Sequence, residues 1–96
     1  MLLEILGRSY FCDILLTLQH QPKSFNDILR DIKVSSSTLN RRIKELTSYN
    51  LIEPIVIRVN DENRIKYRLT KKGYLLIKEL IEFTRLANKL EEVIAV

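Results

Sequence analysis

The sequence predicts a mostly helical α+β fold, and two observations carry that prediction. Apolar residues recur at the spacing of an amphipathic helix through most of the chain. Between residues 51 and 70 they give way to β-branched residues and to apolar–polar alternation, which is the pattern of strands. The predicted order is helix, short strand, helix, helix, two-stranded hairpin and long C-terminal helix. Since 96 residues is the size of one hydrophobic core, we expect a single domain over residues 1–96.

The N-terminal part of the chain predicts two helices of unequal length. Residues 2–20 have helical apolar periodicity, with Gly7 as a weak point. Gln21-Pro22 ends this helix, because proline disfavours the helical conformation in the residue before it. A short second helix begins after Ser24, which stands three residues before Asp27 in a near capping box. Its apolar positions recur at i, i+3, i+4 and i+7 and are Phe25, Ile28, Leu29 and Ile32.

The third helix, about residues 35–49, is the segment most informative about function. Serines at 35–37 supply oxygens that cap its first turn, and a core stripe runs along Leu39, Ile43 and Leu46. Its other face carries short polar or cationic side chains, with no carboxylate before Glu45, and such groups hydrogen-bond base edges and phosphates. About three residues separate it from the second helix, which is helix-turn-helix spacing. The side chains predicted to read bases are Ser36, Ser37, Thr38, Asn40 and Arg41.

The hairpin, about residues 55–70, is predicted to form a basic wing beside this recognition helix. Residues 60–63 (NDEN) are interpreted as its turn, and Pro54 belongs near a strand start or on a free edge because it lacks an amide donor. Carboxylates at the tip, Asp61 and Glu62, are awkward beside phosphates. The residues predicted to contact the DNA backbone are Lys23, Arg42, Lys44, Arg64, Lys66 and Arg68. For Arg42 the alternative is an ion pair with Glu45 or Glu62.

The last helix is predicted to run from Thr70 to about Ile94 and to join two copies of the chain. Its apolar residues follow heptad spacing at Leu76, Leu80, Phe83, Ala87, Leu90 and Ile94. A helix of about 24 residues is about 36 Å long, more than so small a body needs. We therefore expect a homodimer, with residues 1–20 and 74–96 as the dimerisation helices. A monomer that uses this helix in its own core is the alternative.

The charge distribution favours a polyanionic partner. The net charge is +4, and residues 20–72 carry twelve Lys and Arg against six Asp and Glu, a net of +6. Basic residues that neutralise phosphates release counterions, so double-stranded DNA is the expected partner, and a solvated basic surface is the alternative. No apolar run approaches the length of a membrane span, so a cytoplasmic location without membrane contact is expected.

An enzyme is not expected. His20 is the only histidine and Cys12 the only cysteine, so neither a metal set nor an intramolecular disulfide can be assembled from them. Gly7 and Gly73 make no phosphate-binding loop, and no nucleophile–base pair is present. No cofactor is predicted. Cys12 lies among apolar neighbours and is interpreted as a buried, inert thiol.

Three segments resemble those of a known regulator family. They are residues 22–29 (PKSFNDIL), residues 39–46 with 50–53 (LNRRIKEL and NLIE), and residues 67–73 (YRLTKKG). Over about residues 5–80 the chain resembles winged helix-turn-helix transcriptional regulators, most closely the HxlR type and more loosely the MarR, PadR and ArsR groups. The resemblance implies a homodimeric, sequence-specific regulator of double-stranded DNA, with a repressor favoured. Related regulators often bind small aromatic molecules, and such an effector stays open here, as does ordinary core packing of Tyr10, Phe11, Tyr74 and Phe83.

Two departures from the HxlR pattern limit what can be transferred. The group usually has a Gly-Gly-Lys-Trp-like segment and an upstream cysteine, whereas this chain has Gly7-Arg8-Ser9-Tyr10 and a later Cys12. A redox-sensing role is therefore not carried over. The wing turn is also shorter than the family's proline-bearing loop. The function outside DNA binding that was weighed is a winged-helix module for protein–protein interaction.

Overall fold

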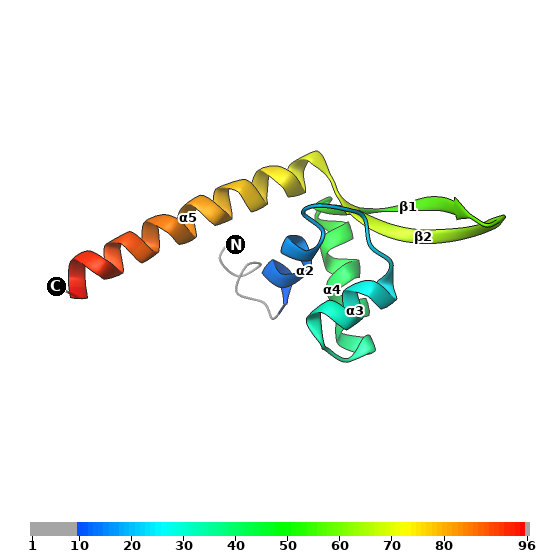
Figure 1. Ribbon diagram of the computed structural model, residues 1–96, viewed down its shortest axis with the longest axis horizontal. Helices are drawn as coiled ribbons and strands as arrows, with labels where there is room; N and C mark the ends of the chain where they lie inside the picture. The colour runs from blue at the N-terminus through cyan, green and yellow to red at the C-terminus, as the bar shows by residue number, and fades with distance from the viewer. Residues whose placement is uncertain (1–9, 96) are drawn as a thin grey trace.

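The computed structural model describes residues 10–95, and Figure 1 shows its arrangement. The described elements, in chain order, are helices α2 (Phe11–Thr17), α3 (Phe25–Ile32) and α4 (Ser36–Ser48), strands β1 (Ile52–Val59) and β2 (Glu62–Leu69), and helix α5 (Lys71–Ala95). The mostly helical α+β class with a two-stranded wing is confirmed. The part of the predicted first helix at residues 1–9, with Gly7, lies outside the described residues.

The hydrophobic core draws side chains from every described helix and from both strands. Its fully buried members lie where the amphipathic patterns put them, and they include Ile14 of α2, Ile28 of α3, Leu39 of α4 and Ile77 of α5. The first described helix ends at Thr17 rather than near residue 20, because the Gln19 amide turns back to the Leu16 carbonyl at 3.1 Å. The residues after it cross to the sheet as a loop.

Side-chain caps define the turn between α3 and α4. The Ser24 hydroxyl accepts a hydrogen bond from the Asp27 amide, and Ser35 does the same for the Thr38 amide, both at 3.2 Å. Lys33 ends α3 in the left-handed conformation (φ 58°). Residues 33–35 alone separate the two helices, so the predicted helix-turn-helix connection and its serine cap are confirmed.

The C-terminus of α4 is closed by a left-handed asparagine. Asn50 has φ 60°, and its amide bonds the Thr47 carbonyl at 2.9 Å. The Leu51 amide bonds the Leu46 carbonyl at 3.0 Å, which completes a Schellman motif. This motif reverses the chain and aims it directly into β1.

The hairpin turn is shorter than the sequence interpretation had it. Asn60 and Asp61 both have positive φ, and Val59 pairs with Glu62, so the turn has two residues and not four. A two-residue turn with both central φ values positive matches the right-handed twist of the strands. Glu62 and Asn63, which were predicted to lie in the turn, are therefore the first residues of β2.

The sheet has a third, one-residue strand at Lys23, as the short predicted strand requires. The Lys23 amide and carbonyl bond Tyr67 at 3.0 and 2.7 Å. Both backbone groups of Tyr67 bond Lys23, so Tyr67 makes no backbone hydrogen bond to Pro54, its partner across the hairpin. No amide hydrogen is therefore required of Pro54 at this position. Pro54 thus occupies a strand position that tolerates its missing amide hydrogen.

Helix α5 leaves the sheet at a tight backbone crossing. The Thr70 hydroxyl accepts a bond from the Gly73 amide at 3.0 Å and caps the helix. A Cβ on Gly73 would lie 2.1 Å from the Leu51 carbonyl oxygen, so only glycine fits there. From this point α5 projects away from the body, on the side opposite to the hairpin (Figure 1).

Candidate nucleic-acid interface

The outward face of α4 is polar, cationic and accessible. Ser36, Ser37, Asn40, Arg41 and Lys44 are all exposed. Within residues 10–95, neither Arg41 nor Lys44 forms an ion pair, so both charges are available to a ligand. This face presents donors and acceptors that suit both base edges and phosphates.

One predicted base reader differs from the others. Thr38 is half-buried, and its hydroxyl accepts a hydrogen bond from Ser35 at 2.8 Å. Ser35 in turn caps the Thr38 amide. Thr38 is therefore part of the cap that holds the first turn of α4, and its oxygen is less available than that of Ser36; the Ser37 hydroxyl has a longer contact with Ser35, at 3.4 Å.

Arg42 points away from the exposed face of α4 and into the domain. Its side chain is 13% exposed and donates to Glu45 at 2.8 Å. Its guanidinium lies over the Phe11 ring, 5.8 Å from the centroid, a cation–π distance. The structure thus contains the ion pair that was the alternative for Arg42, and this pairing competes with the expected phosphate contact. The pair also holds Glu45, the nearest carboxylate, away from the exposed face.

The cationic strip of β2 lies on the sheet face that points away from α4. Leu69 and its partner Ile52 are buried in the core with the helices. Side chains alternate between faces, so the face opposite to the core carries the predicted strip Arg64, Lys66 and Arg68. Arg68 donates to Glu53 at 2.7 Å, and Arg64 lies 3.5 Å from Glu62. The strip is therefore partly neutralised by its own strands.

The wing cation on the helix side of the sheet is one that the sequence interpretation missed. Arg58 pairs across the hairpin with Asn63, on the face that Ile52 and Leu69 occupy. It is 70% exposed, with Asp61 at a loose 3.7 Å. The signal that would have found it is the Asn60-Asp61 dipeptide, because a two-residue turn after Val59 fixes which residues share a face.

Lys23 binds within the domain. Its ammonium donates to Asp31 at 2.5 Å and to the Thr17 hydroxyl at 2.8 Å, and Thr17 donates to the same carboxylate. The Lys23 and Thr17 hydrogen bonds lower the pKa of Asp31. This network ties the end of α2, the Lys23 bridge and the end of α3 together, so the predicted backbone role of Lys23 competes with a structural one.

The residues predicted for dimerisation divide along the length of α5. Leu76 and Leu80 are partly buried against the domain's own core. Phe83, Leu90 and Ile94 are 64%, 64% and 82% exposed, and Ala87 between them is half-buried. Leu86 and Val93, outside the predicted seam, are also exposed. The distal half of the helix thus leaves an apolar surface uncovered by the described residues.

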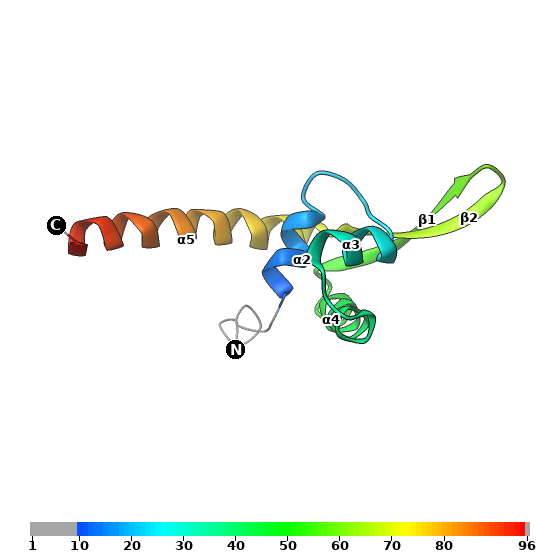
Figure 2. The ribbon, with the colours of Figure 1, turned by 60° about the horizontal axis from the view of Figure 1, so that its bottom comes forward.

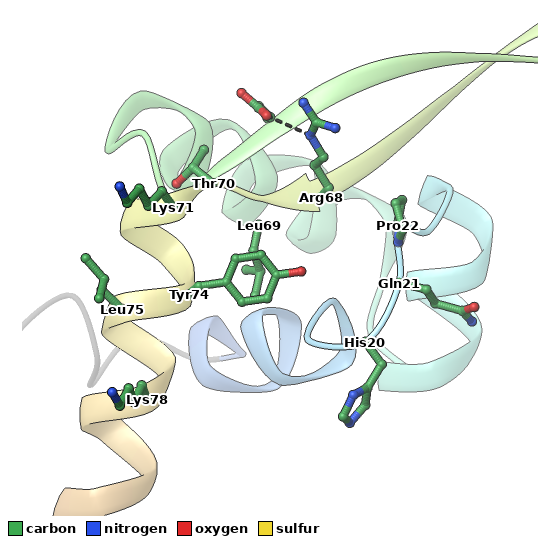
Figure 3. Close-up of a pocket in the computed structure, with 11 residues that line it drawn as sticks. His20, Gln21, Pro22, Arg68, Leu69, Thr70, Lys71, Tyr74, Leu75 and Lys78 are labelled. Carbon is green, nitrogen blue, oxygen red and sulfur yellow. Dashed lines mark hydrogen bonds and ion pairs between the residues drawn. The ribbon is translucent and has the colours of Figure 1, made fainter.

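An open groove of about 680 Å³ lies between the α2–α3 loop, the end of the sheet and the start of α5 (Figure 3). Its lining residues are His20, Gln21, Pro22, Glu53, Arg68, Leu69, Thr70, Lys71, Tyr74, Leu75 and Lys78. Of the four aromatic residues considered for an effector, only Tyr74 lines it. Phe11 is fully buried and Phe83 lies far along α5, so the four do not form one binding space.

Cys12 is a half-buried thiol of α2. Burial, and secondarily the charge of Asp13, raise its pKa, which disfavours the reactive thiolate. Among residues 10–95, no three His, Cys, Asp or Glu side chains are grouped to hold a metal ion. Neither α5 nor any other described helix combines the length and apolarity that a membrane crossing requires.

The described geometry defines a class of protein. A capped helix-turn-helix, a two-stranded wing and a long terminal helix are the architecture of winged-helix DNA-binding transcriptional regulators. The profile of one such family, HxlR-like helix-turn-helix, matches residues 5–94, and the chain belongs to that family. It is therefore a DNA-binding transcriptional regulator, a class whose members are typically not enzymes.

Solved structures agree with this assignment. The reduced form of the transcriptional regulator YodB from Bacillus subtilis is 28% identical, with a TM-score of 0.83 over 92% of this chain and 86% of that one. A possible HxlR family transcriptional factor from Thermoplasma volcanium is 30% identical, with a TM-score of 0.74 over 96% and 83%. A MarR family regulator from Enterococcus faecalis shares the fold, with a TM-score of 0.85 over 97% and 84% at 19% identity. No curated protein matches the chain.

Proposed function

We propose that the protein is a homodimeric transcriptional repressor that inserts α4 into the major groove of a near-palindromic site. The observation that carries this proposal is the exposed face of α4, on which Arg41 and Lys44 have no carboxylate partner among the described residues. Arginine suits guanine and asparagine suits adenine, so Arg41 and Asn40 are the proposed main readers, with Ser36 and Ser37 beside them. Thr38 is proposed to contribute less, because Ser35 holds its hydroxyl.

The wing is proposed to contact the backbone or adjacent minor groove through its tip. Arg58 and Arg64 lie next to the turn on opposite faces, and their carboxylate partners are 3.7 and 3.5 Å away. Such loose, exposed pairs contribute little and exchange readily for a phosphate. Lys44 is proposed to bind phosphate from α4. Lys66, half-buried at the middle of the hairpin, is proposed as a weaker backbone contact.

Dimerisation is proposed to use the distal half of α5. Phe83, Leu90 and Ile94 follow heptad spacing and are largely exposed in one copy. Burial of this stripe against a second copy would remove apolar area from water without disturbing the core. Two-fold symmetry would then set two copies of α4 about one helical turn of DNA apart.

The test is selection of bound duplexes from a random pool, followed by binding measurements at several salt concentrations. We expect enrichment of inverted half-sites with centres about 10 base pairs apart. Affinity for random DNA is expected to fall steeply with salt. A run-off transcription assay, with the selected site placed across a promoter, tests repression. If no sequence were enriched and the salt response were flat, the protein–protein interaction module would replace this proposal.

The proposed dimer is tested separately, by sedimentation velocity. Sedimentation velocity of wild type is expected to give a dimer, and Leu90→Glu together with Ile94→Glu is expected to give a folded monomer. Since both side chains lie outside the described core, the helical circular dichroism of the domain body should persist. A wild-type monomer at micromolar concentration would contradict the proposed dimer.

A further inference from the structure

Helix α4 carries two arginines in succession, and the structure gives them different surroundings. Figure 2 shows α4 at the lower edge of the body, with α2 and α3 above it. Arg41 is exposed and has no ion-pair partner among the described residues. Arg42 is 13% exposed, and its guanidinium lies over the Phe11 ring of α2, 5.8 Å from the centroid. Only one of the two neighbours is therefore presented to a ligand.

Glu45 lies between these two arginines on the surface of the helix. With about 100° per residue, it stands about 40° around the helix axis from Arg41 and about 60° from Arg42. Residues three and four apart on a helix are neighbours, so either guanidinium can reach its carboxylate. In the structure the carboxylate accepts a hydrogen bond from Arg42 at 2.8 Å. Arg41 and Arg42 are therefore competing partners for Glu45, and the fold favours Arg42.

The pair between Arg42 and Glu45 is costly to bury. The attraction between two charges taken out of water repays the lost hydration only when their polar atoms are fully satisfied. The Nε of Arg42 is buried and has no hydrogen-bond partner among residues 10–95. An unsatisfied buried donor lowers stability, so a long apolar side chain over Phe11 would hold the domain at least as well. Stability alone does not account for the charge at position 42.

The consequence of the pair for Arg41 does account for it. Glu45 is the one carboxylate of α4, and its side chain is 22% exposed while it pairs with Arg42. Without Arg42, the cation of α4 placed to pair with it is Arg41, because residues one apart, such as Lys44, do not face it. An ion pair at Arg41 would occupy the donors that a guanine edge requires.

We infer that Arg42 is a positioning residue for base reading. It holds Glu45 away from Arg41, and so it leaves the Arg41 guanidinium available to a base. The inference rests on the proposed function, in which Arg41 is a main reader. It gives Arg42 a part in sequence preference without a contact to DNA, whereas a phosphate contact by Arg42 would be a different role. The two roles differ in how they respond to a change at Glu45.

The test is a double-mutant cycle of Arg42→Met and Glu45→Gln in the full chain, measured by anisotropy on the selected DNA site and its single-base variants. Arg42→Met is expected to weaken binding to the selected site three- to tenfold and to reduce the preference at the base pair read by Arg41. Glu45→Gln added to Arg42→Met should restore the affinity to within twofold of wild type, because the amide has no charge to pair with Arg41. Glu45→Gln alone should stay within twofold of wild type.

Two further measurements separate positioning from a merely structural role. Urea titrations of Arg42→Met should give an unfolding free energy at or above that of wild type, and Arg42→Gln is measured in parallel as a second variant without the charge. In NMR spectra of the free protein, rotation of the Arg41 guanidinium about its Nε–Cζ bond should slow in Arg42→Met and recover with Glu45→Gln.

The matched control is Arg85→Met on α5. Arg85 also forms an ion pair with a glutamate three residues away, Glu82, but this pair lies outside α4. Its loss should change DNA affinity by less than twofold.

Wild-type affinity and base preference in both Arg42 variants would overturn the inference, as would a loss that Glu45→Gln does not restore. A loss shared by every duplex, with the slope of log affinity against log salt reduced by about one, would assign Arg42 to a phosphate instead. Absence of DNA binding in wild type would contradict the proposed function. The rotation of Arg41 would then decide by itself whether Arg42 keeps Glu45 from Arg41.

Discussion

Helix α4 and the wing carry similar charges in the sequence but present them differently. On α4, the one carboxylate is held by the inward-pointing Arg42, and the outward cations Arg41 and Lys44 lack ion-pair partners among the described residues. On β2, Arg64 and Arg68 each lie beside a glutamate of the hairpin. The number of cations in each element therefore overstates the positive charge that the wing offers to a ligand and understates the charge that α4 offers. A cation that is already paired has less to gain from a phosphate.

The two elements also differ in how firmly they are held. Helix α4 has a serine cap, a Schellman motif and three fully or nearly buried side chains in the core. The distal part of the wing is less supported, since the cross-strand pair Val56 and Ile65 is 68% and 58% exposed. A rigid element suits the reading of bases, whereas a loosely supported one suits adjustment to the backbone.

The largest effect should come from the anchor of α4. Leu39→Ala removes a fully buried side chain and leaves a cavity, so we expect the free energy of unfolding to fall by about 2–5 kcal/mol in urea titrations. Ile65→Ala on the wing is the matched control, with an expected change of less than about 1 kcal/mol. Equal losses of unfolding free energy at the two positions would contradict the conclusion that α4 is held more firmly than the wing.

The next largest effect is expected in the proposed recognition of DNA by α4. Arg41→Ala should cost about 1–3 kcal/mol of binding to the selected site and relax the preference at one base pair. Competition titrations with single-base variants of the site measure both quantities. If affinity for every duplex were unmoved by this substitution, α4 would not be the reading element.

A smaller effect is expected at the paired end of the wing. Arg68→Gln breaks an exposed ion pair with Glu53 and should change DNA affinity and unfolding free energy by less than about 1 kcal/mol each. The slope of log affinity against log salt should stay at its wild-type value. A slope reduced by about one would show that Arg68 does bind a phosphate and would restore the predicted strip.

The smallest effect concerns charges that stabilise the fold and are not proposed to touch DNA. The Lys23 and Thr17 bonds lower the pKa of Asp31, and the Ser24 hydroxyl lowers that of Asp27. Because these pKa values are depressed in the folded state, their stabilisation is present above the ordinary aspartate pKa of about 4 and is lost as the pH falls below it. Unfolding titrations at neutral and acid pH should show the loss, and Asp31→Asn should lessen it. If the unfolding free energy of Asp31→Asn depended on pH as strongly as that of wild type, the Asp31 network would not be a source of the acid sensitivity.

Much of the architecture followed from local signals. The Ser35 cap and the apolar spacing predicted α3 and α4, and the period change after Asn50 predicted the hairpin. Such signals can be read from the sequence because caps, periodicity and β-branched runs act over a few residues. Two bounds differed from the prediction, the end of α2 and the hairpin turn, and the side-chain direction of Arg42 decided between the two alternatives left open for it. A four-residue turn in place of Asn60-Asp61 hid which face of the hairpin Arg58 occupies. Nothing local indicates that Arg42 folds inward over Phe11, 31 positions earlier in the chain.

The sequence by itself determined that this chain makes a helix-turn-helix whose second helix is serine-capped and poor in carboxylates, because those properties follow from spacing and residue type. The tertiary structure decided which cations are paired within the protein and which are exposed without a partner among the described residues. Arg42, Lys23 and Arg68 have the same charge as Arg41 and Lys44, but contacts with Glu45, Asp31 and Glu53 turn the first three toward the protein. Charge is a property of the residue, whereas its availability depends on neighbours that only folding brings within reach.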